Sequence, residues 1–79
     1  MNKIYLVEAK HHNGFKFIVG AYFQKKNAEE ILKLIEETKK NPDNIPEKLK
    51  ELAITSCDLK FMGFGIDDWV IQDFPEEQK

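Results

Sequence analysis

Two adjacent histidines, His11 and His12, stand beside an Asn-Gly pair and are the first residues whose types could do chemistry. Imidazole nitrogens bind Zn²⁺, but a zinc site needs at least three protein ligands. Neighbouring residues on a strand end or turn are expected to point their side chains apart, and no HxH, HExxH or CxxC spacing supplies further ligands. The sequence therefore predicts a polar turn around Gly14, and neither a metal nor a cofactor is expected.

Cys57 is the single cysteine, so no disulfide can form within the chain. A thiol becomes a nucleophile when a neighbouring base or positive charge stabilises its thiolate. The surrounding TSCDL is typical of a strand, where a lone cysteine is usually a small buried side chain. No GxSxG motif provides a serine nucleophile, and the Gly63-Phe64-Gly65 stretch lacks the third glycine of a phosphate-binding loop. We therefore expect no catalytic residue and no enzyme activity.

Acidic and aromatic side chains gather near the end of the sequence. Residues 67 to 79 hold five acids and one lysine, whereas residues 1 to 66 hold nine acids and eleven lysines. Carboxylate pairs can act as acid and base or hold Mg²⁺, but charge runs usually face water. Large aromatic side chains within a charged rim are typical of protein interfaces. The residues predicted to bind a partner are Asp67, Asp68, Trp69, Asp73, Phe74, Glu76 and Glu77.

An acidic surface of this kind favours a basic protein partner, because opposite charges accelerate encounter. One alternative remains open, since Trp69 and Phe74 could instead be the largest members of the core, which is the commoner place for such side chains. The neighbouring acids would then form a solvated loop.

The amino-acid composition argues against nucleic-acid and membrane partners. All twelve basic residues are lysines and the net charge is −2, so the arginines and clustered cations that drive nucleic-acid binding are missing. No apolar stretch of about 20 residues is present, and no membrane partner is expected. One cysteine and no signal-peptide core favour the cytoplasm. Abundant Lys, Asn and Ile without Arg suggest an AT-rich genome, bacterial or phage.

The first part of the sequence predicts a β-hairpin. Residues 3–9 and 15–23 are rich in β-branched and aromatic side chains and flank Asn-Gly. A three-residue loop at 12–14, with Gly14 in the left-handed conformation, gives the better alternation of apolar residues. This register is expected to put on one face Tyr5, Val7, Ala9, His11, Phe15, Phe17, Val19, Ala21 and Phe23.

Helical periodicity follows. Residues 27–40 predict an amphipathic helix with an Asn27–Glu30 capping box, although the helix could begin a turn earlier, at Gln24 or Lys25. A shorter helix is expected with Pro46 in its first turn. Alternation at about 55–61 suggests a strand, and the MGFGIDD that follows has the glycine spacing of a loop. Instead of a short helix followed by a strand, residues 46–61 could be mostly helix.

A final strand is expected in DWVIQDF, residues 68–74. The 79 residues thus predict a single globular α+β domain with the order β-β-α-α-β-β. In it a four-stranded, mainly antiparallel sheet carries its helices on one face, and residues 75–79 form a frayed acidic tail.

Three functions are compatible with this fold. The leading one is a small non-catalytic protein-binding domain, an inhibitor or immunity-type protein that engages a basic partner through its acidic, aromatic C-terminal surface. The alternative is a structural or homo-oligomeric module in which the unpaired edge of the last strand joins two copies. The third is a ligand-binding domain or minor enzyme, whose pocket would be lined by Tyr5, Tyr22, Cys57 or His11.

Overall fold

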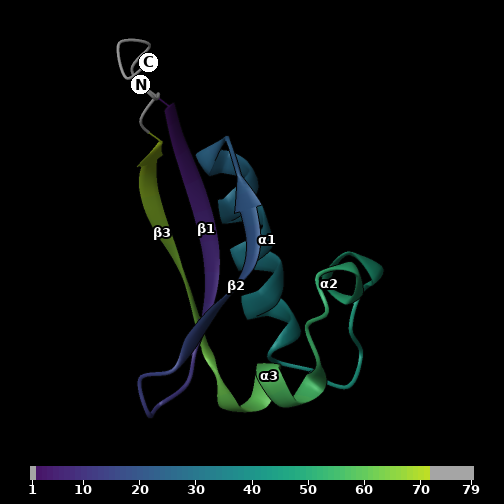
Figure 1. The fold of residues 1–79 in the computed structure, drawn as a ribbon. Coiled ribbons are helices and arrows are strands. Elements are labelled where there is room, and N and C mark those ends of the chain that lie inside the picture. The colour runs from purple at the N-terminus through teal and green to yellow at the C-terminus, as the bar shows by residue number, and fades with distance from the viewer. Residues whose placement is uncertain (1, 72–79) are drawn as a thin grey trace, which may run out of the picture.

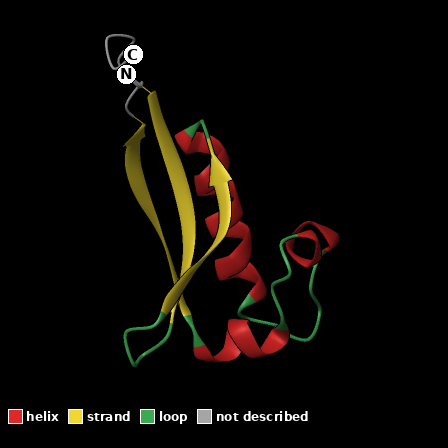
Figure 2. Cartoon of the chain, viewed as in Figure 1, coloured by secondary structure: helices red, strands yellow, loops and turns green. Residues whose placement is uncertain are grey.

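The computed structural model describes residues 2–71, and Met1 and residues 72–79 lie outside the description. Three strands form one antiparallel sheet in the order β2-β1-β3, and helices follow the first hairpin (Figures 1 and 2). In chain order the elements are β1 (Asn2–Lys10), β2 (Lys16–Tyr22), α1 (Lys25–Thr38), α2 (Glu47–Glu51), α3 (Ser56–Phe61) and β3 (Gly63–Ile71).

The fold is α+β, but the predicted four-stranded sheet is wrong, because residues 2–71 contain three strands and three helices. The predicted strand at 55–61 is α3 instead. Thr55 and Asp58 form a capping box: the Thr55 hydroxyl accepts the Asp58 N–H at 3.1 Å, and the Asp58 carboxylate accepts the Thr55 N–H at 2.9 Å. This reciprocal pair satisfies two backbone donors at the helix start and favours helix over strand.

The hairpin loop is confirmed at its turn end. The His11 N–H donates to the Phe15 carbonyl at 2.7 Å, Gly14 has φ of 93°, and Ala9 pairs with Phe17 as expected. A β-bulge at Val19 then shifts the register, so that Val7 pairs with Gly20. A bulge inserts one extra residue into one strand, which exchanges the faces of the residues beyond it.

As a result of the bulge, the predicted faces at the base of the hairpin are wrong. Tyr22 pairs with Tyr5 on the face that α1 covers, whereas Ala21 pairs with Leu6 on the opposite face. The Tyr22 ring lies over Gly20, where an added Cβ would come within 2.8 Å of the Tyr22 hydroxyl oxygen. Gly20 therefore permits this close approach of the aromatic ring to the strand.

Strand β3 is longer than predicted and includes most of the stretch expected to be a loop. It pairs with β1 along nine residues, from Asn2 opposite Ile71 to Lys10 opposite Gly63. Phe64 and Ile66 alternate onto the helix-covered face and pack against the core. The ladder on β1 and this burial outweigh the weak strand preference of the glycines.

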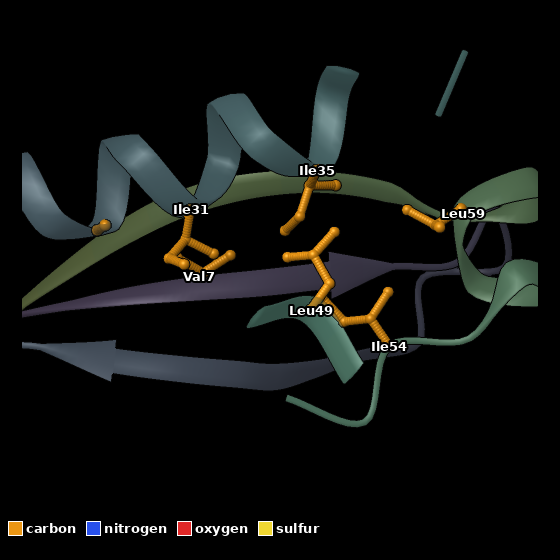
Figure 3. Close-up of a cluster of buried hydrophobic side chains, with 7 residues drawn as sticks. Val7, Ile31, Ile35, Leu49, Ile54 and Leu59 are labelled. Carbon is orange, nitrogen blue, oxygen red and sulfur yellow. The ribbon is translucent and has the colours of Figure 1, made fainter. Parts of the chain in front are cut away.

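Helix α1 crosses one face of the sheet and supplies much of the core. Ala28, Ile31 and Ile35 are buried; Ile31 lies beside Val7 of β1, and Ile35 points toward Leu49 (Figure 3). The helix begins at Lys25, which confirms the earlier of the two predicted starts. The capping box expected at Asn27 is wrong, because that residue already lies within the first turn.

Helix α3 closes the core at the turn end of the sheet, and α2 lies to the side of α1 (Figure 1). Three further buried residues join the same cluster: Leu49 of α2, Leu59 of α3, and Ile54 between the two helices (Figure 3). The Lys39 ammonium donates to the Met62 carbonyl at 2.9 Å and lies 5.4 Å from the centre of the Phe64 ring. Lys39 thereby connects the ends of α1 and α3 to the start of β3, and its charge complements two helix C-termini.

Helix α2 ends in a Schellman motif. The Ile54 N–H donates to the Leu49 carbonyl at 3.1 Å, and the Ala53 N–H donates to the Lys50 carbonyl at 2.9 Å. This motif requires a left-handed residue, and Ala53 has φ of 61°. A Cβ in that conformation costs about 1 to 2 kcal/mol, whereas glycine adopts it freely.

We predict that Ala53→Gly raises the free energy of unfolding by about 0.5 to 1 kcal/mol, because relief of the left-handed strain exceeds the added entropy of the unfolded chain. Urea denaturation followed by circular dichroism measures the change. Ala53→Val serves as the control and should lower stability, since a β-branched residue tolerates positive φ poorly. Equal stability of the three proteins would show that the αL residue carries no strain.

Candidate protein-binding surface

The face of the sheet opposite α1 is covered by no helix of residues 2–71. It is formed by the β1 residues that alternate with the core-facing Val7 and Ala9, together with the β2 and β3 residues that pair with them, because paired residues point to the same side of a sheet. We call this surface the open face, and its members are Ile4, Leu6, Glu8, Lys10, Lys16, Ile18, Ala21, Gly63, Gly65, Asp67 and Trp69.

Apolar side chains at the margins of the open face are exposed to solvent. Trp69 of β3 is 60% exposed and Ile18 of β2 is 56% exposed. Leu6, on the central strand between them, is buried. A tryptophan at such a level of exposure leaves a large apolar area in water, which is characteristic of protein-binding surfaces.

Charges divide the open face into two ends. At the turn end, the Lys16 ammonium lies 3.8 Å from the carboxylate of Glu8, whose side chain is nearly buried. Toward the base, Asp67 is half-buried and its carboxylate accepts the Asp68 N–H at 3.0 Å. Strand β3 contains two acids and no basic residue, so its part of the surface is acidic.

Asp68 lies on the other side of β3, where its carboxylate is 3.5 Å from the Lys3 ammonium. Both side chains are about half exposed, and an exposed ion pair of this type stabilises a protein by about 1 kcal/mol or less. The Asp68 carboxylate can therefore replace its contact with Lys3 by a contact with another cation at little cost in stability.

Three of the seven residues predicted to bind a partner are described. The structure places Asp67 and Trp69 together on the open face, with Asp68 on the opposite side of the same strand. The alternative that Trp69 is a core residue is wrong, because its side chain is largely in solvent. The remaining four, Asp73, Phe74, Glu76 and Glu77, lie outside the described residues.

The histidines do not diverge as expected. The rings of His11 and His12 lie with their centroids 4.1 Å apart, tilted by 36°, and the Asn13 N–H approaches His11 Nδ1 at 3.4 Å. The loop bends the backbone between them, so the alternation of a straight strand does not apply. Within residues 2–71 no group of three or more His, Cys, Asp or Glu side chains could hold a metal ion.

Cys57 is exposed, so the predicted core thiol is wrong. The residue lies in α3, where the helical period turns Leu59 inward instead. The four residues expected to line a ligand pocket are not brought together: a hollow of about 240 Å³ between α1 and α2 includes Tyr22 but not Tyr5, Cys57 or His11.

Sequence reasoning missed this hollow, because it depends on how α2 lies against α1 and no motif encodes that. Its lining residues are Tyr22, Asn27, Glu30, Ile31, Lys48, Glu51 and Leu52. Burial raises the pKa of the Tyr22 hydroxyl above its ordinary value of 10.0, because the charged phenolate is poorly solvated there.

Comparison with known protein families, with curated proteins and with solved structures found no match for this chain. None of the helices in the described part of the chain combines the length and the apolar character needed to cross a membrane.

The raised pKa of Tyr22 predicts a loss of stability at alkaline pH. Above about pH 10 the unfolded tyrosine ionises first, so the free energy of unfolding falls as the pH rises through the unfolded and then the folded pKa. We expect Tyr22→Phe to lose less stability than the wild type between about pH 9 and 11. Parallel stability curves, measured by urea denaturation at each pH, would contradict this assignment.

Proposed function

We propose that the chain is a small non-catalytic protein-binding domain that engages a basic protein partner through β3 and the adjoining part of the open face. The observation that carries the proposal is Trp69, an indole 60% exposed, next to Asp67 and Asp68 on one strand. Masking of the partner, as an inhibitor or immunity-type protein does, is the form of this activity that we propose.

The arrangement provides the two components of a specific interface. Burial of an exposed tryptophan in a partner supplies affinity, since tryptophan is among the residues most often found as binding hot spots. The neighbouring carboxylates supply attraction to lysine and arginine and accelerate association, an effect that salt weakens. We propose that this binding takes place in the cytoplasm, in keeping with the single, exposed cysteine.

Affinity capture from source cells, followed by measurement of the purified interaction, tests the proposal. We expect Trp69→Ala to weaken binding by at least about 30-fold, the equivalent of a hot spot of about 2 kcal/mol. The double variant Asp67→Asn/Asp68→Asn should slow association and reduce its dependence on salt.

Phe61→Ala is the matched control, because Phe61 is another exposed aromatic, 68% exposed, but lies on α3. Its effect should be less than about threefold, and circular dichroism should show that all variants fold. Equal losses in Trp69→Ala and Phe61→Ala would refute the assignment of the surface.

A further inference from the structure

We infer that the partner contributes an extended segment which pairs, as an additional strand, with the edge of β3 that no other strand of residues 2–71 occupies, with two consecutive basic residues opposite Asp67 and Asp68. This inference rests on the proposed function and specifies how the partner is held.

The edge of β3 has the length and regularity that strand addition needs. Its nine residues pair with β1 without a register shift, and no described strand lies on its other side (Figure 2). An edge strand leaves alternate backbone N–H and C=O groups without a partner in the sheet, here over about 30 Å. The Asp68 N–H donates to the Asp67 carboxylate at 3.0 Å, and an incoming strand that pairs there has to replace this contact. Such an edge is a ready template for a strand from another chain.

The other edge of the sheet is a poorer template. Strand β2 is seven residues long, and the bulge at Val19 interrupts its pairing. Bulges twist an edge and disrupt the regular spacing of its hydrogen-bonding groups, which hinders the addition of a further strand. Strand addition is therefore expected at β3 and not at β2.

The side chains of β3 specify the sequence of the incoming segment. Asp67 and Asp68 are consecutive, so they project to opposite faces of the sheet. A strand that neutralises both must carry two consecutive lysines or arginines, because these also project to opposite faces. The Lys3 contact with Asp68 is exposed and weak, and the incoming base can replace it.

A second copy of this chain is a poorer occupant of the edge. Asp67 is the middle residue of β3, so full antiparallel pairing of two β3 strands places Asp67 directly opposite its own copy. Like charges directly opposite each other in a sheet are destabilising, whereas a basic strand gains from the same position. Charge complementarity thus favours a different, basic chain.

The test uses the full chain and a nine-residue peptide, acetyl-Thr-Val-Thr-Lys-Lys-Val-Thr-Val-Thr-amide. We expect its binding to slow hydrogen exchange at alternate β3 amides by at least about tenfold and to leave β2 amides unchanged. Three control peptides are used. A peptide with Glu-Glu in place of Lys-Lys should not bind. Two further peptides are N-methylated at every second residue, one on each alternate set, and at least one of these two should fail to bind, because one set of N–H groups faces β3.

Several results would overturn the inference: absence of binding, binding without protection of β3, or equal binding by both N-methylated peptides. Protection of β3 that appears without peptide as the protein concentration rises would identify a second copy as the occupant. The proposed function is judged separately, by the effect of Trp69→Ala on the captured partner. If the peptide does not bind but Trp69→Ala still weakens the captured partner, strand addition is overturned and the proposed function stands.

Discussion

The structure depends on the pairing of β1 with strands on both of its sides. Each neighbour fixes one edge of β1, and Val7 and Ala9 are fully buried on the core side of this strand. Ile31 lies beside Val7 of this strand and Ile35 belongs to the same buried cluster, so the apolar face of the fourteen-residue α1 forms the second layer. The short helices α2 and α3 add Leu49 and Leu59 to the same cluster and have little core of their own.

A single layer of helices has a direct effect on the surface. One helix can cover one face of a three-stranded sheet, so the side chains that alternate to the other face remain outside the core. Trp69 and Ile18 are the largest of these on the outer strands. The candidate binding surface is thus a product of the same alternation that builds the core, with acids supplied by β3.

Local patterns were sufficient to predict the hairpin loop and α1, because Asn-Gly and an apolar period of 3.6 residues act over a few residues each. The bulge at Val19 was not predictable, since it is fixed by packing of Val19 and Tyr22 against the core. Thr55 and Asp58 did carry a capping signal, but the apparent alternation of the following residues obscured it.

The sequence allowed us to predict which residues form the candidate site, but not which of their side chains are exposed to solvent. Composition drew attention to Asp67, Asp68 and Trp69, whereas alternation alone cannot say which face of a strand a helix covers. The length of β3 could not be predicted from the sequence either, because Gly63 and Gly65 belong to the strand only through their pairing with β1. Pairing between distant segments is the information that a single sequence does not display.

The sheet order also affects when each strand becomes available for pairing during translation. The central strand ends at Lys10, but its second neighbour begins only at Gly63. At about 5 to 20 residues per second the ribosome needs about 3 to 10 s to make the intervening chain, whereas a hairpin forms in about 1 to 10 μs. One edge of the central strand therefore stays without its β3 neighbour throughout that interval.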